Sequence, residues 1–511
     1  MKKAEALILL VNSMTQSERK AFKISSQRPG AQAEYLTLFG VIARDRSITA
    51  GTLRELFQRE SPDSSYENTV KYLYKVILDT LLSLRENQDS NYFLFNRIMK
   101  ARILFEKSLF EECFSLLRRI IEDARKYENY FAQLLASRLE LEYLLALNFP
   151  LVDEKAVLNK HYRINETLNF IRKVNEQSSL YELLKYRIVN YGNVRSQEQK
   201  QNLNDLVVSE MSIVASSSLE SFEIKKLHQL FQANYLIGVG DYKSALRSYM
   251  ELNTLFETNK NLWDNPPIYY LLTQEGVLDS LRSIRNYEGM NYFVNQLRKL
   301  KSPSASFNAN VACLIFLYEL FPRLDRGDFA SALSHLNRYH DDLFDRMNLL
   351  GLTRQAELSL YSALICFGNR EYSRAHRFLN MIILKGKNYY YLPLYRTIRL
   401  VNLMVLNALK DFKLISYETR SLKREIREFG MGYRIEKIML QFLNKQNLPV
   451  TVRKREELWD KVAPELEAIR EDIFEQQVLR IFDFTAWIES RIRRIPIDEV
   501  LQSSSEYTLM H

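Results

Sequence analysis

The sequence predicts an all-α protein built from repeated helical hairpins. Glycine occurs 14 times and proline 11 times in 511 residues, well below their typical usage of about 7% and 5%. Hydrophobic residues make up 46% of the chain and charged residues 26%, which suits a large buried core and argues against disorder. A motif that joins a turn to an aromatic residue also recurs along the chain. Together these observations predict long helices joined by short turns in an elongated array.

Residues 1–90 are expected to form an N-terminal helical unit. The pattern Thr15-x-x-Glu18 matches a capping box and predicts the start of a helix. Three further helices, which could form a three-helix unit, are expected over residues 34–44, 49–58 and 64–85.

The turn motif organises residues 91–440. Each copy has an aromatic residue directly after a turn, a small or apolar residue three positions later, and apolar residues four and seven positions beyond that. The aromatic residues are Phe110, Tyr242, Tyr287, Phe329, Tyr372 and Phe412. The pattern predicts that one helix ends at the turn and the next begins at the aromatic residue. Two degenerate copies are expected in the gap after Phe110, with turns near residues 150–153 and 192–196.

The best copies resemble the tetratricopeptide repeat family. They read Gly240-Asp241-Tyr242 with Ala245 and Gly327-Asp328-Phe329 with Ala332. The resemblance implies a right-handed superhelix of helical hairpins that binds a protein or peptide segment. The tryptophan of the family is absent, and the period is about 43 rather than 34 residues. The segment Met14–Lys23 also resembles the opening of a group of uncharacterised bacterial helical-repeat proteins, which implies no activity.

Residues 450–511 are expected to form capping helices and a tail. Helix signals restart at Arg453 and again near Pro464, because proline favours the first turn of a helix. An amphipathic stripe follows, made of Leu466, Ile469, Ile473, Leu479, Phe482, Trp487, Ile488 and Ile492. A helical array needs such a cap to cover its last apolar face.

The sequence contains no recognisable motif for catalysis, metal binding or cofactor binding. GxSxG, Walker A and HExxH patterns are absent. His335 and His340 would point about 140° apart on a helix and would not share a metal. The three cysteines are expected to be buried free thiols, namely Cys113, Cys313 and Cys366. We therefore expect a cytoplasmic protein with no enzyme activity, cofactor or metal.

No membrane insertion is expected either. The longest uninterrupted apolar run, Val311–Tyr318, is far shorter than the roughly 20 residues that span a bilayer.

Positive charge is concentrated near the end of the repeats. The chain has 71 basic and 62 acidic residues, whereas residues 370–455 have 19 basic and 6 acidic ones. The candidates for a basic patch that binds nucleic acid or an acidic protein are Arg396, Arg399, Lys410 and Lys413. Alternatively, the acidic residues between 456 and 475 neutralise this patch, which makes nucleic acid the less favoured partner.

The resemblance also assigns a partner-binding groove. In tetratricopeptide arrays the first helix of each hairpin lines the concave face. The corresponding candidates are Arg102, Asn234, Glu275, Asp279, Arg282, Phe321 and Phe367. The groove positions are largely apolar and favour an apolar or amphipathic protein segment. Tighter curvature would instead pack these residues as core, and both possibilities stay open at this point.

Three functions are compatible with the sequence. The expected one is a non-enzymatic scaffold that binds a protein or peptide. The second is a transcriptional regulator with an N-terminal helix-turn-helix and ligand-sensing repeats. A recognition helix starting at Ser64 would offer only Lys71 and Lys75 near its start, which weighs against this alternative. The third is an RNA-binding protein that uses its basic C-terminal repeats, and it rests on charge alone.

Overall fold

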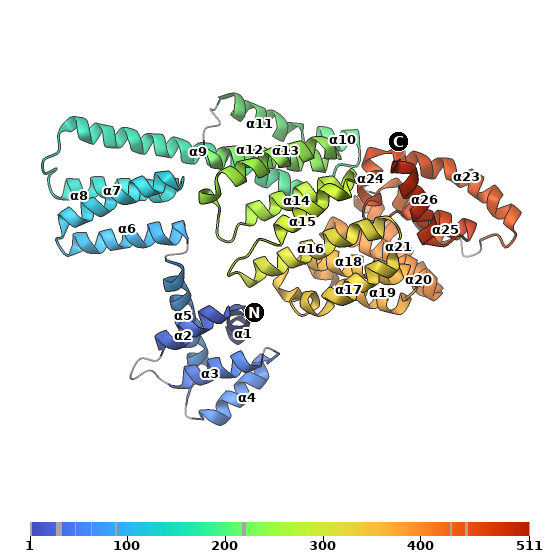
Figure 1. The fold of residues 1–511 in the computed structure, drawn as a ribbon, viewed down its shortest axis with the longest axis horizontal. Coiled ribbons are helices and arrows are strands. Elements are labelled where there is room, and N and C mark those ends of the chain that lie inside the picture. The colour runs from blue at the N-terminus through green and yellow to red at the C-terminus, as the bar shows by residue number, and fades with distance from the viewer. Residues whose placement is uncertain are drawn as a thin grey trace. The chain divides into compact units, whose positions relative to one another are not determined.

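The computed structural model describes residues 3–26, 33–45, 47–62, 64–86, 89–216, 221–429, 432–444 and 448–509. The chain is all-α, as predicted: it is 82% helix, and the described ranges contain no strand. Helices pack mainly against their neighbours in sequence, in the manner of a helical-repeat protein (Figure 1). The chain divides into two compact units.

The first unit comprises residues 1–174 with two short stretches, 261–267 and 302–307. Its helices are α1 (Lys3–Ser13), α2 (Gln16–Ser26), α3 (Ala33–Arg44), α4 (Ala50–Glu60), α5 (Tyr66–Arg85), α6 (Ser90–Glu106), α7 (Phe110–Lys126), α8 (Tyr130–Ala146) and the first part of α9 (Glu154–Tyr191).

Helices α1 to α5 share one apolar core. The capping box forms as predicted, because the Thr15 N–H donates to the Glu18 carboxylate at 2.8 Å and the Glu18 N–H donates to the Thr15 hydroxyl at 3.2 Å. Helices α3, α4 and α5 lie where the sequence places them. Helices α1 and α2 add Leu7 and Phe22 to the same core, so five helices pack together here rather than three.

The second unit holds the rest of the chain. After the end of α9 its helices are α10 (Gln197–Gln201), α11 (Asn204–Ser216), α12 (Phe222–Gly238), α13 (Tyr242–Thr258), α14 (Ile268–Ser283), α15 (Tyr287–Leu297), α16 (Ala305–Asp325), α17 (Phe329–Phe344), α18 (Leu352–Gly368), α19 (Tyr372–Ile383), α20 (Pro393–Leu409), α21 (Phe412–Phe429), α22 (Arg434–Asn444), α23 (Val452–Glu471), α24 (Ile473–Leu479), α25 (Phe484–Arg493) and α26 (Ile497–Leu509). Three short 3₁₀ turns also occur, at Lys260–Leu262, Met347–Leu349 and Gly386–Asn388.

Each aromatic residue of the turn motif is the first residue of a helix, as predicted. Helices α7, α13, α15, α17, α19 and α21 begin at these residues. The residue three positions later is buried in all six copies, from Cys113 to Ile415. The Cys113 thiol lies against the preceding helix, where it donates to the Ala101 carbonyl at 3.2 Å.

The turns share one backbone geometry. Two residues before each aromatic residue, φ is positive, from 56° at Arg285 to 83° at Gly240. The N–H of the next residue donates a hydrogen bond to the carbonyl five residues earlier. Asp241 donates in this way to Leu236 at 2.9 Å, which is the hydrogen bond of a Schellman motif. The Asp241 carboxylate then caps the next helix by accepting the Ser244 N–H at 3.1 Å. Adjacent residues thus end one helix and start the next.

Two expectations about helix boundaries are wrong. Turns do occur near residues 150–153 and 192–196, but one 38-residue helix, α9, joins them in place of two separate helices. No helix begins at Pro464, because α23 runs through it from Val452 to Glu471.

One helix among the described residues, α16, is long and apolar enough to cross a membrane by length and composition. Because 56% of its apolar window is buried in the structure, α16 also fits the description of a core helix.

Candidate partner-binding surfaces

Six of the seven groove candidates lie in the second unit, on the helices that precede the turn motifs. None of the six is exposed. They are Asn234 on α12, Glu275, Asp279 and Arg282 on α14, Phe321 on α16, and Phe367 on α18.

Arg282 is held by groups from α16, from α18 and from Arg480, the residue that follows α24. Its guanidinium pairs with Asp325 at 3.1 Å, donates to the Tyr361 hydroxyl at 3.3 Å, and lies 3.5 Å from the centre of the Phe321 ring. Burial opposes the positive charge, but the Asp325 carboxylate and the Tyr361 hydroxyl together outweigh burial and raise the pKa of Arg282. Arg282 also donates to the Arg480 carbonyl at 2.6 Å. This cation is therefore satisfied within the unit.

Asp279 binds a side chain from the C-terminal segment. The Arg480 guanidinium pairs with the Asp279 carboxylate at 2.8 Å, donates to the Ser283 hydroxyl at 3.0 Å, and lies 5.1 Å from the centre of the Tyr242 ring. Burial disfavours the charge of Arg480, yet Asp279 together with Tyr242 and Tyr361 raises the pKa of Arg480 overall. The repeat helix α14 thus recognises a segment of its own chain 201 positions away.

Asn234 and Glu275 belong to two further polar contacts. Asn234 accepts a hydrogen bond from the Lys185 ammonium at 3.0 Å. Glu275 forms an ion pair with Arg354, whose guanidinium also pairs with Glu357 at 2.6 Å. Burial lowers the pKa of Lys185 and raises the pKa of Glu357.

The two aromatic candidates are packed as core. Phe321 makes edge-on contacts with Tyr318 and Tyr361, and Phe367 packs against Tyr372. Four of the six candidates, Asn234, Arg282, Phe321 and Phe367, are buried among side chains of their own unit, whereas Glu275 and Asp279 are 25% and 26% exposed. Whether any of them binds a partner stays a prediction.

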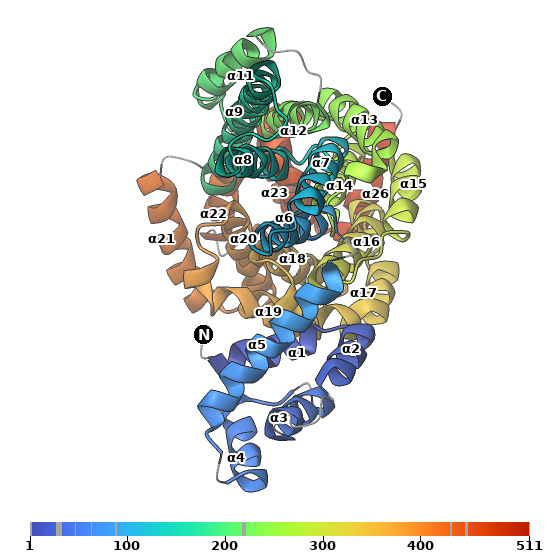
Figure 2. The same cartoon turned by 90° about the vertical axis from the view of Figure 1, so that its left-hand side faces the viewer.

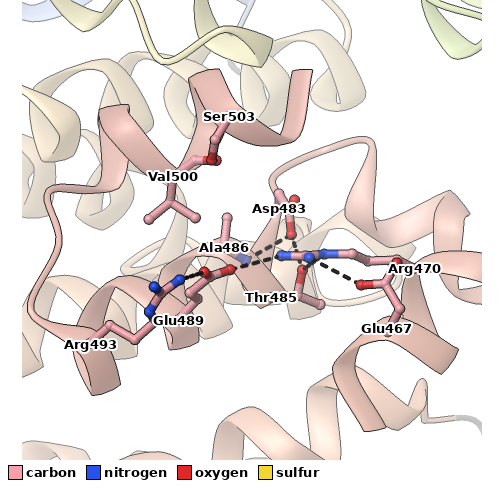
Figure 3. Close-up of polar contacts among 9 residues, drawn as sticks. All are labelled: Glu467, Arg470, Asp483, Thr485, Ala486, Glu489, Arg493, Val500 and Ser503. Carbon is pink, nitrogen blue, oxygen red and sulfur yellow. Dashed lines mark hydrogen bonds and ion pairs between the residues drawn. The ribbon is translucent and has the colours of Figure 1, made fainter. Parts of the chain in front are cut away.

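The C-terminal helices are fastened to one another by a polar cluster. Figure 3 shows Arg470 of α23 donating to the Thr485 hydroxyl at 2.7 Å and pairing with Glu489 of α25 at 3.4 Å. Glu489 also pairs with Arg493 at 2.7 Å. These contacts join α23 to α25, the helices on either side of the short helix α24.

Helix α24 is in turn bonded to the repeats. Glu475 accepts the backbone N–H groups of Arg434 and Ile435 at 2.6 and 3.1 Å, and so caps the N-terminus of α22. Gln477 donates to the Val194 carbonyl at 2.8 Å. The sequence predicted a cap on the last apolar face, but α24 and Arg480 also reach helices far earlier in the chain.

The seventh groove candidate, Arg102, lies in the first unit. It is exposed on α6 and forms no ion pair or hydrogen bond within the described part of the chain. Arg102 lies at the edge of a row of exposed apolar side chains on the same helix. The row has spacings of three and four residues and consists of Tyr92, Phe95, Met99 and Ile103. This spacing places them on one face of the helix.

A second exposed apolar row lies on α8, which packs beside α6 and α7 (Figure 1). It contains Phe131, Leu135 and Leu145. The side chains that form the core of α6, α7 and α8 are different ones, such as Leu94, Ile98 and Ala136. Sequence reasoning missed both rows. A signal was present, since apolar residues occupy more than one face of α6.

The basic-patch candidates separate into two pairs. Arg399 on α20 pairs with Glu418 and Glu425 of α21 at 2.9 and 2.8 Å, and Arg396 pairs with Glu425 and Glu436 at 3.6 Å. Their side chains are only 11% and 14% exposed. Carboxylates of α21 and α22 therefore pair with these arginines, a role that the sequence analysis assigned to residues 456–475.

Lys410 and Lys413, by contrast, are exposed. Lys410 ends α20 with φ of 63°, and Lys413 is the second residue of α21. The exposed charge of this region therefore belongs to α21 and the turn before it.

The chemistry of the remaining reactive groups is limited. No group of three His, Cys, Asp or Glu side chains in the described ranges could hold a metal ion. All three cysteines are buried, and burial raises the pKa of Cys313 and of Cys366 to about 12. Such thiols stay protonated near neutral pH and are poor nucleophiles.

No family model, no curated protein and no solved structure matches this chain.

Proposed function

We propose that this protein is a non-enzymatic helical-repeat scaffold that binds an amphipathic helix of a partner protein on the exposed face of α6 and α8. The observation that carries the proposal is the pair of exposed apolar rows. Met99 and Ile103 are 51% and 54% exposed, and Phe131 on the neighbouring helix is 66% exposed. Large apolar side chains grouped on one surface are typical of protein interaction sites.

The charge at Arg102 indicates what the partner helix carries. Arg102 lies eight residues before the aromatic residue of its turn motif, as Asn234 and Asp279 do in theirs. In the two copies of the second unit with a polar residue here, Asn234 binds Lys185 and Asp279 binds Arg480. The other three copies carry the buried apolar residues Phe321, Leu364 and Met404. By the same logic, Arg102 pairs with an Asp or Glu of the partner.

The proposal includes the finer architecture expected from the sequence. The hairpins wind into a right-handed superhelix of tetratricopeptide type, and the protein acts in the cytoplasm. Sequential packing of neighbouring helices and the conserved geometry of the six turns support this view.

A display library of helical peptides tests the proposal. Selection on the wild-type protein should enrich peptides with apolar residues at spacings of three and four, together with an acidic residue. Selection on Arg102→Glu should replace that acidic residue by Lys or Arg, because the charge of the site is reversed.

A matched pair of variants locates the site. Met99→Glu/Ile103→Glu should abolish binding of the selected peptides. Val208→Glu/Met211→Glu should leave it intact, since Val208 and Met211 are similarly exposed on α11 in the other unit. Equal binding by both variants, or the same selected peptides with and without the Arg102 reversal, would contradict the proposal.

A further inference from the structure

Helix α21 carries a regular stripe of exposed basic side chains. Lys413, Tyr417, Arg420, Arg424 and Arg427 follow one another at spacings of four, three, four and three residues, and all five are exposed. Such spacing aligns them on one face of the helix. At 1.5 Å per residue the stripe is about 21 Å long.

The acidic residues of the middle of α21 lie on a different face. Glu418 and Glu425 are bound by Arg399 of α20, so their charges are neutralised within the fold. Figure 2 shows α21 at an edge, with α20 and α22 on one side of it. Ion pairing toward α20 therefore places Glu418 and Glu425 away from the exposed side chains of Lys413, Arg420 and Arg427.

We infer that this stripe binds single-stranded nucleic acid. The basic groups would bind successive phosphates, which is the main source of affinity for a nucleic acid backbone. Tyr417 is 66% exposed and lies among them, where its ring can stack on a base. An amphipathic helix that lies on a membrane would instead need a broad apolar face beside the charges. This surface is separate from the α6 and α8 rows, so it does not depend on the proposed peptide site.

Binding of a fluorescently labelled oligouridine of about 20 nucleotides to the full chain tests the inference. Anisotropy measured between about 50 and 200 mM salt should show affinity that falls steeply with salt. Arg420→Glu/Arg427→Glu should weaken binding at least tenfold and reduce the slope of log K against log salt by about 1.4, since each lost phosphate contact removes about 0.7 for a single strand. Tyr417→Ala should weaken binding about fivefold or more, and Tyr417→Phe should restore it.

The control is Lys243→Glu/Arg247→Glu on α13. It makes the same change in net charge at two exposed positions of the same unit and should alter the affinity less than twofold. Circular dichroism melting should show that every variant folds, and Arg420→Gln/Arg427→Gln replaces the reversal if that variant does not. Weak binding without salt dependence, equal losses in the α21 and α13 variants, or binding to anionic vesicles or acidic peptides but not to the oligonucleotide would each overturn the inference.

Discussion

His335 is a titratable side chain buried against an aromatic ring. It is 4% exposed, and its imidazole stacks on Phe316 with ring centres 5.1 Å apart. Nε2 lies 3.1 Å from the Phe316 carbonyl and 3.8 Å from the Glu319 carboxylate. Burial lowers the pKa of His335, although the Phe316 carbonyl and Glu319 act in the opposite direction. The folded protein therefore favours the neutral ring.

This shift predicts a loss of stability in mild acid. Below pH about 6.5 the unfolded chain takes up a proton at this histidine that the folded protein resists, so the free energy of unfolding falls as the pH falls. His335→Gln removes the titration. The difference in urea midpoint between wild type and His335→Gln should therefore be constant above pH about 7 and should shift in favour of the variant between about pH 6.5 and 5. A difference that does not change over this range would show that His335 titrates normally in the fold.

At the scale of elements, the starts of the hairpin helices could be predicted because their signals are local. All six copies have a residue with positive φ two positions before the aromatic residue, and four of them have an Asp or Asn cap directly before it, as in Gly240-Asp241-Tyr242. The length of α9 and the passage of α23 through Pro464 depend on tertiary packing, in which Leu466 and Ile469 are fully covered. Such packing overrides local preference and is not visible in a short stretch of sequence.

A glycine on the first helix of a hairpin allows that helix to pack closely against the second helix of the previous hairpin. A Cβ at Gly368 on α18 would overlap the Phe329 ring of α17. Gly368→Ala should therefore destabilise the protein by about 1–3 kcal/mol through overpacking. Gly40 on α3 is a helical glycine with nothing within 4 Å of its added Cβ. Gly40→Ala should leave stability unchanged or raise it by up to about 1 kcal/mol. Equal urea midpoints for the two variants would contradict this account of the repeat packing.

At the scale of the whole chain, the largest gap in sequence-based prediction concerns the C-terminal segment. The sequence places Asp279 and Arg282 on a repeat helix, yet nothing local connects them to Arg480. The exposed apolar rows on α6 and α8 were missed for a related reason, since a row of apolar residues in the sequence looks the same whether another segment covers it or not. Whether a segment distant in the sequence packs over a repeat helix decides if the face of that helix is available to a partner.

Removal of α24 to α26 tests how far the second unit depends on this coverage. A chain that ends at Asp472 loses Arg480 and Gln477, leaving Asp279 and the Val194 carbonyl without their partners. A partly buried carboxylate without its partner and newly exposed apolar side chains should together cost about 3 kcal/mol or more. We expect a lower melting temperature and stronger binding of the dye ANS. A chain that ends at Gln502 keeps these contacts and should behave like wild type. If both truncations melt like the full chain, the C-terminal helices contribute nothing to the stability of the repeats, and the contacts of Arg480 and Gln477 are dispensable for the fold.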